Sequence, residues 1–445
     1  MMTRKLVSLS ESDLSECCDQ FERSITLKRT KKMRRHWKAL FLLAVITFVI
    51  YYIVYWEEDR VRNMIISAKQ SAEFMFVPVP PHPFHVNCTA LFQGNKTEIY
   101  NAISVQAPPN PPVLPPIASC ETFKQTQGYI LDVSKEEMEF PIAFSILVYK
   151  NSHQAERLIR AVYRPSNVYC IHVDRKSTAM LEEMRRLAAC FDNVFLSSRQ
   201  VDVKWGTFSV LEPELICMED LLKHRKWRYF INLTGQEFPL KTNYQLVKIL
   251  QAYRGANDVA GTATRYNENM RRFWSAGSAP HGLRPVIGSV HIVVNRHFVN
   301  FSVHDPVAKD LQKWLRHTKI PDETYFSTLN YNPDLNIPGT FKGVPRLEPF
   351  LARYKNWDHG LLAYKDDCRG KYLREICVLG AGDVAQLITK RHLFANKFEE
   401  GFQPAGLSCL EEWYHDQTRR ERAGHREYDT TFYSKLDFVL NQIRR

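Results

Sequence analysis

The pattern of apolar and polar residues changes at about residue 140. From there on, short apolar runs alternate with segments in which apolar residues recur every three or four positions, the spacing typical of one helix face. The predicted strands cover residues 142–149, 168–174, 194–196 and 229–233, and the predicted helices cover residues 152–163, 177–191 and 211–224. This alternation predicts an α/β domain with a doubly wound parallel sheet.

A second apolar segment lies near the N-terminus. Residues 39–56 carry no charge and follow a basic run between Lys28 and Lys38. A helix over this segment is about 27 Å long, close to the thickness of an early-secretory bilayer. Because Lys and Arg stay in the cytosol, we predict a type II signal anchor with residues 1–38 cytosolic and the rest lumenal. A cleaved signal peptide is the alternative, but the segment ends in Tyr55 and Trp56 rather than in small residues.

Residues 57–139 show no sustained periodicity and contain Pro-rich stretches at 77–81 and 107–116, which predicts a lumenal stem before a catalytic domain at 140–445. An even number of cysteines in an oxidising lumen favours disulfides. Zinc is the alternative, but no Cys-x-x-Cys occurs among these cysteines, so we expect no metal site. The lumenal cysteines are Cys88, Cys120, Cys170, Cys190, Cys217, Cys368, Cys377 and Cys409.

Four Asn-x-Ser/Thr sequons, at Asn87, Asn95, Asn232 and Asn300, fit the lumenal location. The first two lie in the predicted stem. Asn232 follows the apolar run 229–231, which leaves burial without a glycan as the alternative there.

The formal net charge of +12 raises the question of a nucleic-acid partner. The first 38 residues hold ten Lys or Arg against five Asp or Glu, so five of the twelve charges belong to the cytosolic tail. The remainder is spread over segments of mixed sign, which favours a small anionic ligand and no nucleic acid.

Nucleotide-sugar enzymes often hold the donor diphosphate through a divalent ion bound by Asp-x-Asp, and the lumenal sequence contains no such motif. Asp174 ends the second predicted strand, where the first aspartate of the motif would be expected, and ligands bind beyond this end of such strands. If the ligand is a diphosphate, side-chain cations must neutralise it.

Candidate cations lie near the C-terminus. Arg369, Lys371 and Arg374 fall between Cys368 and Cys377, and residues 380–383 (Gly-Ala-Gly-Asp) lead into a predicted amphipathic helix. Its basic residues are Lys390, Arg391, His392 and Lys397. The glycine turn could receive phosphate through backbone amides, but an ordinary helix start with Asp383 as N-cap is the favoured interpretation.

Asp322 and Glu323 follow Pro321 at a predicted helix start. On the residues alone, acids that offset the helix dipole are the favoured interpretation. The alternative is a general base, because a sugar hydroxyl needs a carboxylate within hydrogen-bond reach to become a nucleophile.

Taken together, these motifs resemble the animal β-1,6-N-acetylglucosaminyltransferases of the core 2 and I-branching type, glycosyltransferase family 14, which also includes peptide xylosyltransferases. The resemblance runs from about residue 86 to residue 414. Its motifs lie at residues 140–143, 169–174, 231–243, 321–323, 380–383 and 392–398.

The resemblance implies an α/β fold of the glycosyltransferase-A type, a doubly wound mixed sheet with a disulfide-stapled N-terminal stem, and inverting transfer without metal or cofactor. It implies that Glu323 is the base, that Arg374 and Lys397 stabilise the departing diphosphate, and that Asp174 lies in the nucleotide site. It also implies the disulfides Cys88–Cys409, Cys120–Cys190, Cys170–Cys217 and Cys368–Cys377.

Acceptor recognition is where the chain departs from the branching enzymes. They place a glutamate where this sequence has Ala260, and a Trp and a Tyr two apart where it has Trp357 and His359. Arg271, Trp357 and His359 are the candidate acceptor contacts. The loss of a carboxylate partner should cost a hydrogen bond to the acceptor sugar.

The resemblance thus predicts a single-pass Golgi enzyme that transfers N-acetylglucosamine from UDP-N-acetylglucosamine in β-1,6 linkage to a core 1 mucin-type O-glycan on glycoproteins. The alternatives are another UDP-sugar, glucose or xylose, another acceptor, or an inactive lumenal binding protein. Retention of Glu323, Arg374 and Lys397 argues against the inactive protein. A sulfotransferase would need a glycine-rich phosphate loop after the first strand, which residues 149–152 lack. A homodimer is left open.

Overall fold

The computed structural model describes residues 42–43, 45–58, 60–62, 84–108, 114, 116–262, 270–344, 350–358 and 367–444. The chain divides into a unit at 1–73 and a compact unit at 74–445. The predicted anchor at 39–56 lies partly outside the described residues; residues 45–58 are helical with exposed side chains. Within the described ranges, no helix is at once long enough and apolar enough to cross a membrane.

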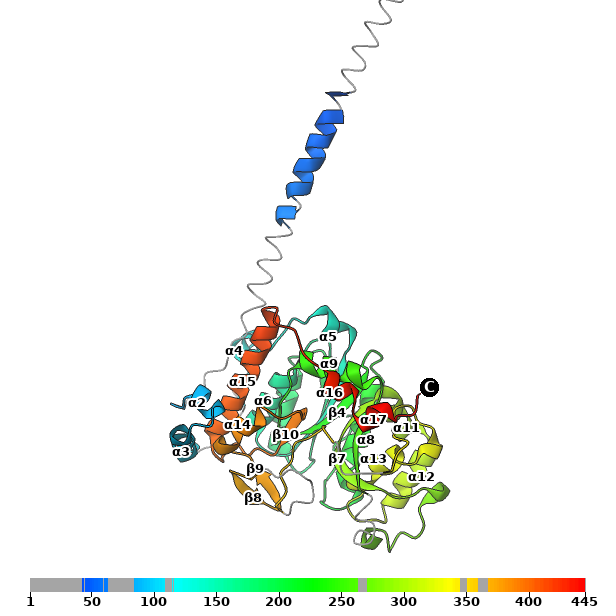
Figure 1. Ribbon diagram of the computed structural model, residues 1–445. Coiled ribbons are helices and arrows are strands. Elements are labelled where there is room, and N and C mark those ends of the chain that lie inside the picture. The colour runs from blue at the N-terminus through cyan, green and yellow to red at the C-terminus, as the bar shows by residue number, and fades with distance from the viewer. Residues whose placement is uncertain are drawn as a thin grey trace, which may run out of the picture. The chain divides into compact units, whose positions relative to one another are not determined.

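A six-stranded sheet with the order β3-β2-β1-β4-β7-β6 is the centre of the larger unit (Figure 1). The first four strands are parallel, and β7 and β6 are antiparallel to their neighbours. This confirms the α/β class with a mixed sheet. The strands are β1 (Ile142–Val148), β2 (Val168–Val173), β3 (Val194–Leu196), β4 (Tyr229–Thr234), β6 (Asp258–Thr262) and β7 (Ile287–Asn295).

Helices cover both faces of this sheet (Figure 1). Successive strand residues point to opposite faces, so Phe144 and Ile146 join one core while Ala143 and Cys170 join the other. Each large buried side chain contributes about 1.5–3 kcal/mol. The first core includes α6 (Ser152–Val162), α7 (Thr178–Ala188) and α9 (Asn243–Tyr253), and the second includes α8 (Glu212–Leu222), α11 (Arg296–His304), α12 (Pro306–Leu315) and α13 (Asp322–Asn330).

The described part of the predicted stem contains four short helices that pack on the catalytic region. These are α2 (Cys88–Phe92), α3 (Lys96–Ser104), α4 (Cys120–Thr126) and α5 (Lys135–Glu139). The disulfide Cys88–Cys409 ties α2 to α15 (Pro404–Arg422), and Cys120–Cys190 ties α4 to the end of the α7 segment. With Cys170–Cys217 and Cys368–Cys377, the structure contains the four pairs that the resemblance implies. The described part of the stem is therefore folded onto the domain.

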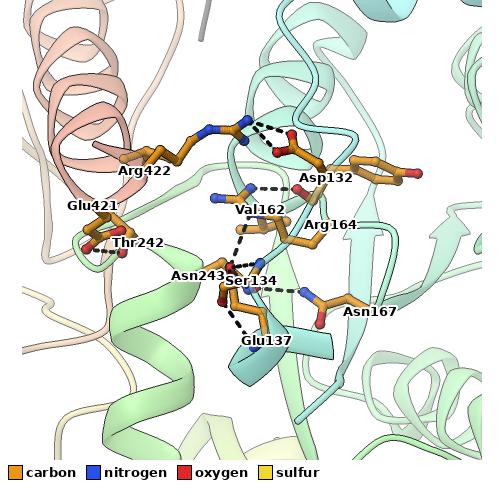
Figure 2. Close-up of polar contacts among 12 residues, drawn as sticks. Asp132, Ser134, Glu137, Val162, Arg164, Asn167, Thr242, Asn243, Glu421 and Arg422 are labelled. Atoms are coloured by element: carbon orange, nitrogen blue, oxygen red, sulfur yellow. Dashed lines mark hydrogen bonds and ion pairs between the residues drawn. The ribbon is translucent and has the colours of Figure 1, made fainter. Parts of the chain in front are cut away.

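Polar contacts fix the stem at the edge where β1 and β2 begin (Figure 2). Glu137 closes a capping box with Ser134 at the start of α5, an arrangement that satisfies backbone donors of a first turn. Its other carboxylate oxygen accepts from Asn243 Nδ2 at 2.7 Å and lies 3.5 Å from Arg164 Nε. Arg422 Nη2 donates to both carboxylate oxygens of Asp132, at 2.6 and 2.7 Å. This edge, opposite the carboxyl ends of the strands, is thus closed by structural contacts.

Candidate active site

A cavity of about 250 Å³ lies beyond the carboxyl ends of β1, β2 and β4. Its wall is largely apolar and includes Leu147, Val203 and Val210, and Asp174 lines it beside the end of β2. Ligands of doubly wound sheets bind at this edge. The predicted position of Asp174 is confirmed; its contact with a nucleotide stays a prediction.

Asp174 is held in a cluster that fixes the neighbouring segment 201–207. Lys176 donates from its backbone N to Asp174 Oδ1 at 3.0 Å, and its Nζ lies 3.2 Å from Asp174 Oδ2 and 2.8 Å from Asp202 Oδ1. His172 Nε2 accepts from Val201 N at 3.0 Å. Burial lowers the pKa of His172 to about 4, so this ring remains a neutral acceptor near neutral pH.

Segment 201–207 connects the cavity to the start of α13. Val203 lines the cavity, and Gly206 O accepts from Ile320 N at 2.9 Å. Lys319 N in turn donates to Arg272 O at 3.1 Å. Backbone hydrogen bonds therefore bring Glu323, in the first turn of α13, to the same edge of the sheet as the cavity.

Glu323 is partly exposed and held by a cation. Arg272 Nη1 lies 2.7 Å from Glu323 Oε2, and the two side chains are 17% and 29% exposed, respectively. A carboxylate that is oriented by a cation and open to solvent on another side can accept a proton from an incoming hydroxyl. Arg272 was missed in the sequence, because nothing local to residue 272 indicates contact with residue 323.

Asp322 behaves differently from its neighbour. Burial, followed by the charge of Glu323, raises the pKa of Asp322 to about 7. Its Oδ1 is buried with no hydrogen-bond partner among the described residues. The predicted helix start after Pro321, with Asp322 and Glu323 as acids of its first turn, is confirmed, and the structure adds that one carboxylate oxygen of Asp322 is buried.

Arg374 lies in the turn of a disulfide-bridged hairpin. Strands β8 (Lys371–Leu373) and β9 (Ile376–Val378) are antiparallel, and Arg374 and Glu375 between them have φ values of 54° and 63°. Such φ values are unusual for residues other than Gly or Asn, and the Cys368–Cys377 bridge helps to hold the hairpin. Lys397 Nζ donates to Leu373 O at 3.1 Å. The structure thus brings Lys397 beside the turn that carries Arg374.

The Lys397 segment also reaches the cavity. Phe398 N donates to Gln236 O at 2.8 Å, and Gln236 lines the cavity. Partial burial lowers the pKa of Lys397; the carboxylate of Glu399 opposes this, and the charges of Lys150, Arg374 and Lys371 add to it. Several cations therefore gather near one side of the cavity.

A helix begins after residues 380–383 as predicted, but the prediction that it contains Lys390, Arg391, His392 and Lys397 is wrong. Helix α14 (Val384–Leu387) ends after four residues, and the chain returns as β10 (Phe394–Asn396), which pairs with β5 (Glu237–Pro239). Phe394 and Ala395 are fully buried, so pairing and burial in this strand prevail over the local helical pattern. Lys390, Arg391 and His392 lie between the two elements, and Lys397 follows the strand.

The glycine turn is structural, as favoured. Asp383 accepts from Gly380 N at 2.8 Å and from Arg369 N at 3.0 Å, and Ala381 N donates to Gln403 Oε1 at 2.9 Å. Because these amides are used within the protein, they are not presented to a phosphate. Asp383 closes the turn without capping α14 through its side chain.

A buried ion pair underlies the site and was missed in the sequence. Arg353 Nε lies 2.7 Å from Glu237 Oε2, with both side chains fully buried. Asn396 Nδ2 donates to Glu237 Oε1 at 3.1 Å. Burial lowers the pKa of Lys355 nearby, and the charges of Glu237 and Glu323 oppose that effect. The pair holds β5, β10 and the segment that leads to Trp357 together.

The predicted acceptor contacts are only partly brought together. Arg271 lies with its guanidinium 5.8 Å from the ring centre of the exposed Trp274, next to the Arg272 that pairs with Glu323. Trp357 forms a β-bridge with Ile376 in β9. His359 lies outside the described residues. Ala260 sits at an irregularity between β6 and β7, and its carbonyl accepts from Ser327 Oγ at 2.7 Å.

The sequons differ in accessibility. Asn87, Asn95 and Asn300 are exposed, and the first two cap α2 and α3 through their side-chain oxygens, which leaves each amide nitrogen directed away from the helix. Asn232 is 5% exposed, and its amide hydrogen-bonds to Val290 O and Ile292 N, both at 2.8 Å. The folded chain therefore does not present Asn232 as a glycan acceptor.

No cluster of three or more His, Cys, Asp or Glu side chains in the described ranges is arranged to hold a metal ion. Independence from metal stays a prediction.

Comparisons with known proteins point to one family. The family model described as "Branch: Core-2/I-Branching enzyme" matches residues 142–388. The beta-1,3-galactosyl-O-glycosyl-glycoprotein beta-1,6-N-acetylglucosaminyltransferase 4 of Danio rerio is 30% identical over 87% of this chain and 96% of its own length. The N-acetyllactosaminide beta-1,6-N-acetylglucosaminyl-transferase of Homo sapiens is 31% identical over the same shares. Among solved structures, mouse xyloside xylosyltransferase 1 covers 43% of this chain and 81% of its own, at 11% identity and a TM-score of 0.26.

Proposed function

The chain belongs to the Core-2/I-branching enzyme family of glycosyltransferases, and from that premise we propose that it transfers N-acetylglucosamine from UDP-N-acetylglucosamine in β-1,6 linkage to the core 1 disaccharide of mucin-type O-glycans. The observation that carries the proposal is the backbone connection from the cavity through Gly206 and Ile320 to the helix start with Glu323. It supports a nucleotide site and a base at one edge of the sheet.

In the proposed reaction, Glu323 takes the proton of a 6-hydroxyl of the acceptor. The hydroxyl oxygen forms a bond to C1 of the donor sugar as the bond between C1 and the diphosphate oxygen breaks. Attack from the face opposite the diphosphate inverts the anomeric centre and releases UDP. Arg272 orients the base through the 2.7 Å ion pair.

Side-chain cations balance the charge of the departing UDP. Arg374 and Lys397, which the hydrogen bond from Lys397 Nζ to Leu373 O keeps close together, stabilise the negative charge that develops on the diphosphate. A metal ion has the same role in enzymes with Asp-x-Asp, and we propose that this chain works without one.

The proposed location is the Golgi lumen, with the chain in type II orientation through residues 39–56. Support comes from the four disulfides, which need an oxidising compartment, and from the exposed sequons at Asn87, Asn95 and Asn300.

A second candidate is the same chemistry with another acceptor or with UDP-glucose or UDP-xylose. It is favoured by Ala260, a methyl side chain at the position where the resemblance implies an acceptor-binding carboxylate.

The test is a donor screen with the purified full-length chain. UDP-N-acetylglucosamine, UDP-glucose and UDP-xylose are each supplied with a core 1 disaccharide in excess EDTA, and the products are identified by mass. We expect transfer of N-acetylglucosamine, and we expect Glu323→Gln to lower its rate roughly 10²–10⁴-fold. Transfer of glucose or xylose instead would replace the proposal with the second candidate, and no transfer from any donor to the core 1 disaccharide would overturn it.

A further inference from the structure

Lys150 contributes a cation to the cavity itself. It follows β1 at the carboxyl edge of the sheet, and among the described residues that line the cavity it is the one Lys or Arg. The two cations that the resemblance assigns to the donor, Arg374 and Lys397, are not among these lining residues. A ligand that fills the cavity would therefore meet Lys150 before it meets either of them.

The Lys150 ammonium is only loosely paired within the protein. Its Nζ lies 3.9 Å from Glu399 Oε1, with the side chains 38% and 23% exposed, and 5.5 Å from the ring centre of Tyr149. The Nζ of Lys176, two residues after the cavity-lining Asp174, instead lies 2.8 Å from Asp202 Oδ1 and 3.2 Å from Asp174 Oδ2. A pair at 3.9 Å between partly exposed groups contributes little, so Lys150 can exchange Glu399 for a stronger anion.

Lys150 also lies close to the other donor cations. Its charge is one of those that lower the pKa of Lys397, together with Arg374 and Lys371, and its partner Glu399 is two residues from Lys397. Lys150, Lys397 and Arg374 thus form a path of positive charge that starts at the cavity and ends at the hairpin turn. Three cations in a row suit a diphosphate better than a single neutral sugar, because each phosphoryl group needs its own hydrogen-bond donors.

We infer that Lys150 is a donor-binding residue that contacts the diphosphate where it leaves the nucleoside cavity and continues toward Lys397 and Arg374. This inference rests on the proposed function, since it requires a nucleoside diphosphate donor. In the absence of donor, the Lys150 ammonium is paired with the Glu399 carboxylate. When the diphosphate binds, the ammonium leaves Glu399 and contacts the phosphate oxygens.

The test compares two ligands that differ only in the diphosphate. UDP and uridine are titrated by calorimetry, in EDTA, into the full-length protein, Lys150→Met and Lys150→Arg. We expect Lys150→Met to weaken UDP about tenfold and to leave uridine unchanged, and Lys150→Arg to retain most of the UDP affinity. Lys226→Met, a substitution of an exposed lysine just before the start of β4, is the matched control and should change neither ligand.

The outcomes separate the inference from the function on which it rests. UDP binding that is unchanged in Lys150→Met, or an equal loss for UDP and uridine, would overturn the role of Lys150 and leave the proposed function standing. A wild-type protein that binds neither ligand would overturn both.

Discussion

Two regions of this molecule are rich in charge, and they use it in opposite ways. Between α6 and α15, Arg157, Arg160, Glu156 and Glu411 lie with side chains at most 9% exposed and form ion pairs of 2.7 to 3.0 Å. Although burial opposes it, Arg157 and Arg160 hold the pKa of Glu411 well below its usual range. Every charge in this cluster is engaged by another protein charge.

On the donor side of the candidate active site, three cations are partly exposed and their partners within the protein are weak. Lys397 donates to a backbone carbonyl, Lys150 has a carboxylate at 3.9 Å, and Arg374 is exposed in the hairpin turn. A cationic side chain that has no strong partner within the protein can still bind an anionic ligand. The difference indicates how to distinguish charged side chains that stabilise the fold from those that bind a ligand: the first are buried and paired, and the second are partly exposed and weakly paired.

The largest effect is expected at the carboxylate of the active site. Glu323→Gln keeps the shape and removes the base, so turnover should fall roughly 10²–10⁴-fold while UDP affinity is nearly unchanged. Initial rates and UDP titrations on the same preparation measure both quantities. Asp322→Asn is the control; because Asp322 Oδ1 is buried and the pKa of this carboxyl is raised to about 7, we expect altered stability and largely preserved turnover. If Asp322→Asn abolished turnover in a folded protein while Glu323→Gln kept most of it, the base would be Asp322.

A substitution in the buried cluster between α6 and α15 should lower the free energy of unfolding. Arg160→Ala leaves Glu156 and Glu411 without their shared partner in the interior, and breaking a buried pair in this way costs about 3–5 kcal/mol. Urea unfolding followed by tryptophan fluorescence measures the loss. If the variant kept wild-type stability, the claim that these charges are structural would fail.

Lys397→Ala is the counterpart at the site. It should lower turnover roughly 10–100-fold, in EDTA and in Mn²⁺ alike, and change the free energy of unfolding by less than about 1 kcal/mol. Rates and unfolding curves for Lys397→Ala and Arg160→Ala together give the comparison directly. Rescue of Lys397→Ala by Mn²⁺ would mean that a metal can carry the diphosphate charge.

The smallest expected effect concerns pH at the edge that binds the stem. Burial raises the pKa of Glu421 to about 7, with the hydrogen bond from Thr242 opposing the shift. An acid whose pKa is higher in the folded state stabilises the fold most at pH values below its unfolded pKa, and this stabilisation is lost as pH rises through about 4.5 to 7. Between pH 5 and 7 the free energy of unfolding should therefore fall by on the order of 1–2 kcal/mol less in Glu421→Gln than in the wild type. Equal slopes of stability against pH in both proteins would contradict the assignment.

Much of the fold could be predicted from the sequence because its elements follow local periodicity. The predicted strand at 168–174 corresponds to β2, and the predicted helix at 152–163 corresponds to α6 within a residue. The helix predicted after residues 380–383 does not extend to Lys390–Lys397 because β10 pairs with the distant β5, and a three-residue strand has no period of its own.

The candidate site was predictable where a motif carries it and unpredictable where two distant segments meet. The resemblance named Glu323, Arg374 and Lys397, and their roles stay predictions. Arg272 and Lys150 were missed because their contacts, with Glu323 and Glu399, join segments far apart in the sequence. The burial of Asp322 could not be predicted either, since a position in the first turn of a helix does not reveal which way the side chain points.

The most direct test of the central claim is the anomeric configuration of the product made by the full-length chain from UDP-N-acetylglucosamine and a core 1 disaccharide in excess EDTA. We predict a β-1,6-linked N-acetylglucosamine, recognised by NMR from the large H1–H2 coupling of its new anomeric proton and from the shifted carbon resonance of the acceptor C6. An α-linked product, or activity that is absent in EDTA and restored by Mn²⁺, would contradict metal-free inversion with Glu323 as the base.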